Sequence, residues 1–294
     1  MKRVLITGKN SYIGTAIEQR LLGEPGMFDV RTVDVRGFDW LEMDFSGYDS
    51  VFHVAGIAHV PPSNVQDESY RRVNCDLAVD LALKAKREGV RQFIFMSSSI
   101  VYGDSRPFRV QTPIACDTAL APANVYGESK AEAESRLQVL WDNHFAVALL
   151  RCPMVYGPSC VRGNFPALVR LAQKAPFFPQ IRNKRSMLYV GNLAELVSEI
   201  VKQGRGGIFL PQNKECVSTS EVVRIIAEQS GRRMRFTSLF NPLVEGLTAI
   251  HPLARKAFGN LFYEESASDF GFEYQKYSLV QSIEQIAEKD GWRQ

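Results

Sequence analysis

Two segments of the chain carry residues that could act together on an alcohol. An apolar run at 92–96 ends in three serines, Ser97–Ser99, and Tyr126 and Lys130 follow with a spacing of four. Side chains four apart share one face of a helix, so both could project into one pocket. Chemistry on an alcohol needs a base, and a neighbouring ammonium favours the phenolate of a tyrosine, whose ordinary pKa is about 10. Ser98 would bond the same substrate oxygen. Taken alone, the Tyr/Lys pair is more typical of an exposed helix without a function.

A second candidate site is the glycine-containing turn after the first apolar run. Gly8 and Gly14 occupy the first and last positions of a G-x-x-G-x-x-G spacing, and Ser11 takes the middle one. In a dinucleotide-binding turn, glycines let the backbone approach a pyrophosphate at a helix N-terminus. The Ser11 hydroxyl could bond a phosphate oxygen, or its bulk could weaken the grip. A strand-to-helix turn with two glycines is also often purely structural.

A carboxylate 20 residues beyond Gly14 favours the binding interpretation. Asp34 closes a predicted strand, where it could accept both ribose hydroxyls of NAD, and its charge would repel the 2′-phosphate of NADP. Arg36 works against this preference, because an arginine nearby can accept that phosphate. Asp34 could also be a solvated turn residue. Asp44 and Phe45 are expected to flank an adenine ring.

These residues need a scaffold, and the hydrophobic pattern predicts one. Short β-type runs at 4–6, 29–35, 50–55, 92–96 and 145–150 alternate with helical patterns at 12–22, 67–88 and 124–141. This cadence predicts right-handed βαβ units around a parallel sheet, an α/β fold. After Arg151 the chain is more irregular. A helix at 193–202 and a strand at 207–210 return to the sheet, and further helices are predicted at 220–230, 243–258 and 278–289.

Composition excludes several classes of function. The 294 residues are 45% apolar and 23% charged, which is enough for one large core or two smaller ones. A net charge of +3 does not support a role at nucleic acid or at a membrane surface. Five cysteines without paired spacing argue against a disulfide framework and a structural metal. No apolar run is long enough for a membrane helix or a signal peptide, so we expect a cytoplasmic protein.

Together, these motifs resemble one family. Thr7-Gly8 with Gly14, Asp34, the serines leading into Val101-Tyr102-Gly103, and Tyr126-x-x-x-Lys130 are similar to the extended short-chain dehydrogenase/reductases, in their nucleotide-sugar epimerase/dehydratase branch. The segments 51–56, 151–158 and 185–193 resemble further family segments. The resemblance implies a Rossmann-type doubly wound parallel sheet with a smaller, irregular α/β substrate lobe at the C-terminus. Residues 1–152 plus about 186–210 would bind NAD, and 153–185 plus about 211–294 would bind substrate.

The resemblance also assigns roles to individual residues. Ser98, Tyr126 and Lys130 would be catalytic, helped by an oxidised nicotinamide, and Tyr102 is not the catalytic tyrosine. His53 is expected to be a packed core residue. Substrate would contact Ser98, Ser99, Asn164 and Arg185, the last at the nucleotide diphosphate. NAD would be held by Gly8, Ser11, Tyr12, Ile13, Gly14, Asp34, Arg36, Asp44, Phe45, Val54, Ala55, Gly56, Tyr126, Lys130 and Pro153.

Several reactions fit such a site. Sugar 4,6-dehydratases of the branch carry an Asp-Glu pair directly after the catalytic hydroxyl residue, whereas this chain has Ser99 and Ile100, which disfavours elimination. The first hypothesis is a 4-epimerase acting on a UDP-hexose through a 4-keto sugar. The alternatives are an NAD(P)H-dependent 4-ketoreductase and a non-catalytic dinucleotide-binding regulator. A homodimer through the helices at 67–88 and 124–141 is expected from the resemblance.

Overall fold

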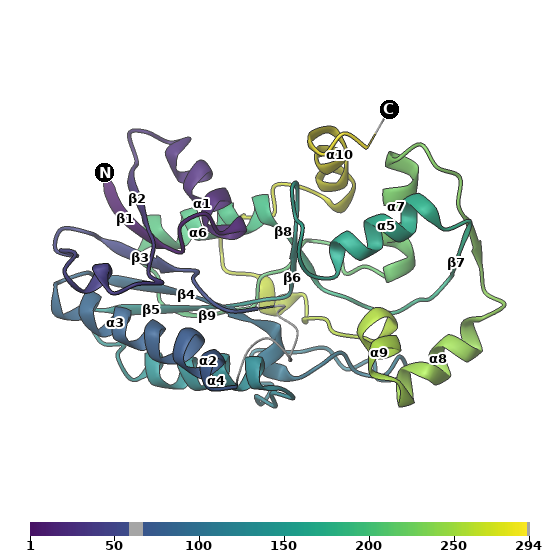
Figure 1. Ribbon diagram of the computed structural model, residues 1–294, viewed down its shortest axis with the longest axis horizontal. Coiled ribbons are helices and arrows are strands. Elements are labelled where there is room, and N and C mark those ends of the chain that lie inside the picture. Colours follow the sequence, from purple (N-terminus) through teal and green to yellow (C-terminus); the bar gives the residue numbers. More distant parts are fainter. Residues whose placement is uncertain (59–66, 293–294) are drawn as a thin grey trace.

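The computed structural model describes residues 1–58 and 67–292, and a six-stranded parallel sheet organises its N-terminal part (Figure 1). The strand order is β2-β1-β3-β4-β5-β9. The predicted α/β fold with a parallel sheet is therefore confirmed. The strands are β1 (Lys2–Thr7), β2 (Phe28–Val33), β3 (Ser50–His53), β4 (Gln92–Ser98), β5 (Ala146–Cys152) and β9 (Gly207–Phe209).

Both faces of this sheet are buried, and alternate side chains of each strand point into the two cores. Val4 and Ile6 of β1 point into one core with Ile94 of β4, whereas Leu5 and Phe93 point into the other. Successive side chains of a strand point to opposite faces, so a strand that is apolar throughout requires cover on both sides. One face is covered by α1 (Tyr12–Leu22) and α6 (Val190–Gln203), the other by α3 (Leu77–Arg87) and α4 (Val125–Gln138).

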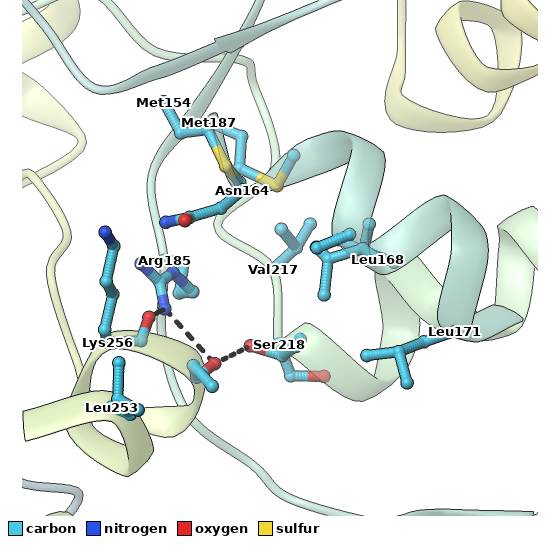
Figure 2. A pocket seen from close by; sticks show the side chains of 14 residues that line it. Met154, Asn164, Leu168, Leu171, Arg185, Met187, Val217, Ser218, Leu253 and Lys256 are labelled. Carbon is cyan, nitrogen blue, oxygen red and sulfur yellow. Dashed lines mark hydrogen bonds between the residues drawn. The ribbon is translucent and has the colours of Figure 1, made fainter. Parts of the chain in front are cut away.

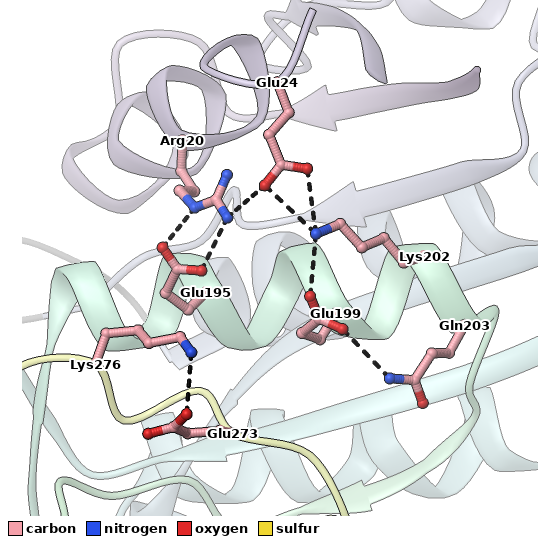
Figure 3. A network of polar contacts seen from close by, with 8 residues as sticks. All are labelled: Arg20, Glu24, Glu195, Glu199, Lys202, Gln203, Glu273 and Lys276. Atoms are coloured by element: carbon pink, nitrogen blue, oxygen red, sulfur yellow. Dashed lines mark hydrogen bonds and ion pairs between the residues drawn. The ribbon is translucent and has the colours of Figure 1, made fainter. Parts of the chain in front are cut away.

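Ion pairs between α1 and α6 reinforce one of these layers (Figure 3). Arg20 of α1 forms a bidentate pair with Glu195 of α6, at 2.5 and 2.9 Å, and also contacts Glu24. Lys202 lies 3.1 Å from Glu24 and 3.0 Å from Glu199. These partly buried pairs connect α1 to α6, although the two helices are far apart in the sequence.

The strand order reverses between the neighbouring strands β1 and β3. From β1 the chain proceeds to β2 on one side, whereas β3, β4 and β5 follow on the other. The register places Thr7 beside His53, and His53 beside Phe95. Ligands of open α/β sheets bind beyond the carboxyl ends of the strands at such a reversal. The turn after Thr7 and the segment after His53 therefore face one another.

The rest of the chain forms a smaller lobe of short elements, on the right in Figure 1. Two two-stranded parallel sheets pair β6 with β8 and β10 with β7. The lobe's largest core cluster contains Tyr156, Phe165, Met187, Val223 and Ile283. Its elements are β6 (Met154–Tyr156), α5 (Phe165–Lys174), β7 (Phe177–Pro179), β8 (Met187–Tyr189), α7 (Thr219–Gln229), β10 (Arg235–Thr237), α8 (Asn241–Ile250), α9 (Pro252–Phe258) and α10 (Leu279–Lys289).

Two of the predicted helices are interrupted. The pattern at 67–88 becomes α2 (Asp67–Arg71), a π-helical turn at Arg72–Asp76 and then α3. The pattern at 243–258 divides at His251 into α8 and α9, because Pro252 cannot donate the next backbone hydrogen bond. Within residues 1–58 and 67–292, no helix combines the length and the apolar character needed to cross a bilayer.

Candidate active site

The turn between β1 and α1 brings its backbone close to the end of β3. Gly8 has a φ of +116°, and a Cβ there would lie 3.1 Å from the amide nitrogen of Ala55 and 3.1 Å from Cγ1 of Val54. A Cβ on Gly14 would lie 2.5 Å from Oγ of Ser11. Neither position has room for a side chain, and positive φ is a conformation that glycine adopts at little cost. These glycines are therefore required by the turn itself.

The N-terminus of α1 retains free backbone donors. Oγ of Ser11 accepts from the amide of Gly14 at 3.1 Å, so this serine is the N-cap of the helix. The amides of Tyr12 and Ile13 donate to no residue that the structure describes. Two unpaired N–H groups beside a glycine turn suit the pyrophosphate of a dinucleotide. The residues present thus fit NAD, and the Ser11 hydroxyl, which accepts from the helix through a lone pair, keeps its O–H free to donate to a phosphate.

Asp34 directly follows β2, but it has a partner of its own. Nε of Arg36 lies 2.9 and 3.0 Å from the two carboxylate oxygens of Asp34, and the Arg36 amide donates to the same group at 3.0 Å. The guanidinium holds the pKa of the exposed Asp34 carboxyl at about 2. Asp34 is therefore ionised at neutral pH, and a ribose placed there would meet a carboxylate already paired with Arg36.

The structure corrects the expectation for Phe45. Its side chain is fully buried in the core that α3 and α4 cover, beneath Nζ of Lys84 at 5.1 Å, and its amide donates to Glu88 at 2.7 Å. The Phe45 ring therefore cannot flank an adenine. Asp44 is exposed, and both its oxygens accept from Ser46, at 2.7 and 2.9 Å.

The segment after β3 is fixed by a residue that the sequence reasoning missed. Asn74, in the π-helical turn, accepts from the amide of Ile57 at 2.8 Å and donates to the Ile57 carbonyl at 3.1 Å. Its amide nitrogen also lies 3.2 Å from Oγ of Ser129 on α4. A Cβ on Gly56 would lie 3.0 Å from the Asn74 oxygen and 3.6 Å from Nζ of Lys130. Asn74 thus connects the Val54–Gly56 segment to the helix of the candidate base.

Ser98 and Tyr126 form the hydroxyl pair of the site. Ser98 ends β4, and Tyr126 lies in the first turn of α4, which Asn124 caps by accepting from the Gly127 amide at 2.9 Å. Burial raises the pKa of Tyr126 to about 12, and the hydrogen bond with Ser98 opposes this rise. The structure brings these two predicted residues together.

Lys130 occupies a buried position one helical turn beyond Tyr126. Its ammonium donates to the carbonyl of Met96 at 2.8 Å and lies 4.4 Å above the ring of Phe95. Burial lowers its pKa to about 8, against a smaller opposing effect of Glu134. This lysine therefore loses its proton far more readily than a lysine in water.

A buried polar network beneath Lys130 was not predicted. Glu134 accepts from Arg151 with both oxygens, from Nε at Oε1 at 3.2 Å and from Nη2 at Oε2 at 2.7 Å, and also bonds the hydroxyl of Ser97. The guanidinium of Arg151 donates to the hydroxyl of Tyr102 at 2.6 Å. Glu134 lies four residues after Lys130 on a buried helix face, which was the one available signal. Tyr102 belongs to this network rather than to the reacting pair.

Further predicted residues lie at the carboxyl ends of the strands. His53 packs between Phe93 and Phe95, which agrees with its predicted role in the core, and burial lowers its pKa to about 3. Ser99 is buried and bonds the side chain of Tyr263. Pro153 is buried directly after β5, whose Cys152 pairs with Ser98.

Tyr12 reaches the substrate lobe. Its side chain packs against the lobe core, and its buried hydroxyl has no hydrogen-bond partner among the described residues. A Cβ on Gly157 would lie 2.6 Å from this hydroxyl. The first turn of α1 is therefore in contact with both parts of the molecule.

The two predicted substrate residues of the lobe line one cavity, of about 280 Å³ (Figure 2). Asn164 and Arg185 face it together with Met154, Met187 and Lys256. The Arg185 guanidinium donates to the carbonyls of Lys256 and Ala257, at 2.7 and 3.2 Å, and has no carboxylate partner in the described part of the chain. Burial lowers its pKa to about 10, so it remains charged at neutral pH. A partly buried cation whose partners are two carbonyls and the hydroxyl of Ser105 is suited to an anionic ligand.

A parallel sheet with a glycine turn and a Ser/Tyr/Lys set at its carboxyl edge defines an extended short-chain dehydrogenase/reductase. The profile of the NAD dependent epimerase/dehydratase family matches residues 4–209. The chain belongs to this family, and its cofactor is NAD.

Individual relatives agree with this assignment. The UDP-glucose 4-epimerase of Vibrio cholerae is 32% identical over 251 residues, which cover 77% of this chain and 75% of the relative. The dTDP-D-glucose 4,6-dehydratase of Mus musculus is 30% identical over 166 residues, 54% of this chain and 45% of its own. A solved structure of UDP-glucuronic acid 4-epimerase from Bacillus cereus in complex with NAD shares the fold, with a TM-score of 0.74 and 18% identity over 98% of both chains.

Proposed function

We propose that this enzyme inverts the configuration at C4 of a nucleotide-sugar, with a UDP-hexose as the substrate class. The observation that carries the proposal is that Ser98 and Tyr126 meet at the carboxyl end of β4, with the buried Lys130 one helical turn away. Two neighbouring hydroxyls can hold a single alcohol oxygen between them. The name of the Vibrio cholerae relative, at 32% identity, supports the same reaction.

The residues of this chain have separate tasks in the reaction. The phenolate of Tyr126 takes the proton of the sugar 4-hydroxyl and later returns it, and Ser98 donates a hydrogen bond to the same oxygen. The positive charge of a bound nicotinamide would favour this phenolate over the buried phenol, whose pKa is about 12. When bound, NAD accepts a hydride from the sugar and gives it back. Lys130, with a pKa of about 8, can exchange a proton at its ammonium near neutral pH. Arg185 binds the diphosphate, so that the keto sugar can turn about this link and expose its other face.

The environment of Ser98 favours epimerisation over dehydration. Loss of water from the sugar needs an acid and a base beside the oxidised carbon. The next two residues are Ser99, whose hydroxyl bonds Tyr263, and Ile100. Glu134, the carboxylate beneath the site, is occupied by Arg151. None of these residues offers a free carboxyl group for elimination.

A panel of UDP-hexoses and their N-acetyl derivatives tests the proposal, with the products identified by NMR. We expect interconversion of C4 epimers without net consumption of cofactor. Stoichiometric oxidation of added NADH or NADPH would instead identify a reductase, and a 4-keto-6-deoxy product would identify a dehydratase.

The Tyr126→Phe variant tests the assignment of the base. Removal of a positioned base costs about a hundredfold to ten-thousandfold in rate, so we expect kcat to fall within that range while NAD stays bound. Tyr48→Phe is the matched control, because Tyr48 lies in the core outside the site, and it should keep its activity. Wild-type turnover by Tyr126→Phe would overturn the proposed mechanism.

A further inference from the structure

Helix α8 is oriented with its apolar side away from the protein. Leu243, Leu247 and Ile250 lie within an arc of about 60° at 3.6 residues per turn. Their exposed fractions are 62%, 37% and 78%. The only buried residue of the helix is Thr248, on the opposite side. A surface helix normally has the reverse arrangement, with its apolar stripe against the core.

Hydrogen bonds fix this orientation. Oγ1 of Thr248 accepts from the amide of Phe108 at 3.0 Å, and Nδ2 of Asn241 donates to the carbonyl of Gln180 at 2.7 Å. Arg255 of α9 donates to the last carbonyls of α8, at 2.9 Å to Thr248 and 2.7 Å to Ala249. The polar side of α8 is thus bonded to three separate segments, and rotation of the apolar stripe toward the core would break these bonds.

Neighbouring side chains enlarge the apolar surface. Phe240 stacks on Phe177 of β7 at 6.4 Å, and both are exposed. Of the 21 large apolar side chains that are exposed in the described ranges, six lie within residues 239–253. Such a concentration on one surface marks an interaction site. We call it the α8 surface, formed by Phe177, Leu239, Phe240, Leu243, Leu247, Ile250 and Leu253.

The chain segment that contains α8 has a surplus of positive charge. Residues 229–262 contain five Arg and Lys residues and one carboxylate, a surplus of four, whereas the whole chain has a net charge of +3. Arg232, Arg233, Arg235 and Lys256 are exposed, and no ion pair within residues 1–58 and 67–292 involves any of them. The contrast with the paired charges of α1 and α6 is evident (Figure 3). A small net charge thus conceals a strongly basic region.

We propose that the α8 surface docks on the surface of an anionic lipid bilayer. A helix with exposed leucines and adjacent arginines lies in the interfacial plane, where acyl chains bury the apolar stripe and lipid phosphates meet the basic groups. A second copy of the chain fits less well, because a symmetric contact would bring the two basic regions together. Leu253 and Lys256 also line the cavity of Arg185, so the docked face borders the candidate substrate site. This proposal goes beyond the expectation of no membrane partner, which rested on the small net charge and on the lack of a long apolar run.

Vesicle co-sedimentation of the full chain tests this proposal. Phosphatidylcholine vesicles that contain phosphatidylglycerol should bind the protein, with binding that weakens as salt increases. Pure phosphatidylcholine vesicles should bind the protein at least about tenfold more weakly, since each basic group near an anionic surface contributes to affinity. Equal binding to both kinds of vesicle, or no binding to either, would overturn the proposal.

Variants locate the contact. We expect Leu243→Glu/Ile250→Glu to lose about tenfold or more of the binding, because both apolar side chains would leave the interface and two negative charges would enter it. Val139→Glu/Val161→Glu, at positions that are exposed elsewhere, should bind like wild type. All four positions are exposed, so the fold should be retained, as circular dichroism and epimerase activity without vesicles would show. If the first variant leaves vesicle binding intact, or instead dissociates an oligomer in sedimentation velocity, the α8 surface has a different partner.

Discussion

The two candidate subsites hold their charged groups in different ways. The first subsite lies at the carboxyl ends of the strands and is called the sheet edge below. There, Lys130 lies on a helix, donates to the carbonyl of a β-strand residue and lies near the Glu134–Arg151 pair. In the cavity of the lobe, Arg185 follows an irregular segment and donates to two carbonyls of α9 and to the hydroxyl of Ser105. The lysine has a nearby carboxylate within the protein, and the arginine has none bonded to it.

This difference matches two kinds of work. A reacting group must remain in one place while its protonation changes, and regular elements position groups more precisely than loops do. A binding group instead gains when its counter-charge arrives with the ligand, because its buried charge is then compensated. We therefore expect changes at the sheet edge to reduce the rate, and changes in the cavity to reduce affinity.

The strongest test of this contrast is Lys130→Met. Loss of the ammonium beside the hydroxyl pair should lower kcat about a hundredfold or more, with a smaller effect on KM. Steady-state kinetics with a UDP-hexose would measure both. A variant that lost affinity and kept kcat would show that Lys130 belongs with the binding groups.

The same variant has a signature in stability. Because the folded-state pKa of Lys130 is about 8, the folded protein has released this proton between pH 8 and 10, whereas an unfolded lysine still holds it. The unfolded state then binds more protons, so the free energy of unfolding rises with pH in this range. We expect urea denaturation to show wild type gaining up to about 1.4 kcal/mol per pH unit relative to Lys130→Met. A constant difference would mean that Lys130 titrates normally.

The residues of the sheet edge could be predicted, because they follow the regular spacing of a helix and of a strand. Tyr126 and Lys130 four apart, and serines at the end of an apolar run, locate the site as soon as the βαβ order is recognised. Asn74 was not predictable, since its role depends on a π-helical turn inside a pattern that indicates a continuous helix. The partners of Arg185 could not be predicted either, because Lys256 and Ala257 lie about seventy residues later in the sequence, on an irregular part of the chain.

A smaller effect is expected when Arg185 is changed. A charged hydrogen bond to an anion contributes about 1.5–3 kcal/mol, so Arg185→Met should raise KM for a nucleotide-sugar about tenfold to a hundredfold and leave kcat within a few-fold. Arg182→Met, at an exposed position three residues earlier, is the matched control and should change neither value. Titration with UDP alone would report the same loss without any reaction. If UDP binding were unaltered, the diphosphate would lie elsewhere.

The smallest effect is expected for substitutions of Ser11. They distinguish two roles of its hydroxyl, capping helix α1 and contacting the cofactor. An N-cap serine replaced by alanine costs about 1 kcal/mol, whereas glycine costs only a few tenths. Ser11→Ala should therefore lower the melting temperature by about 2–4 °C, and Ser11→Gly by less. Both variants keep the free amides of Tyr12 and Ile13 as donors to the pyrophosphate, so we expect neither to weaken NAD binding appreciably. Calorimetry and NAD titration would measure the two quantities. A Ser11→Ala variant of unchanged stability that bound NAD tenfold more weakly would mean that the hydroxyl contacts the cofactor and leaves the helix uncapped.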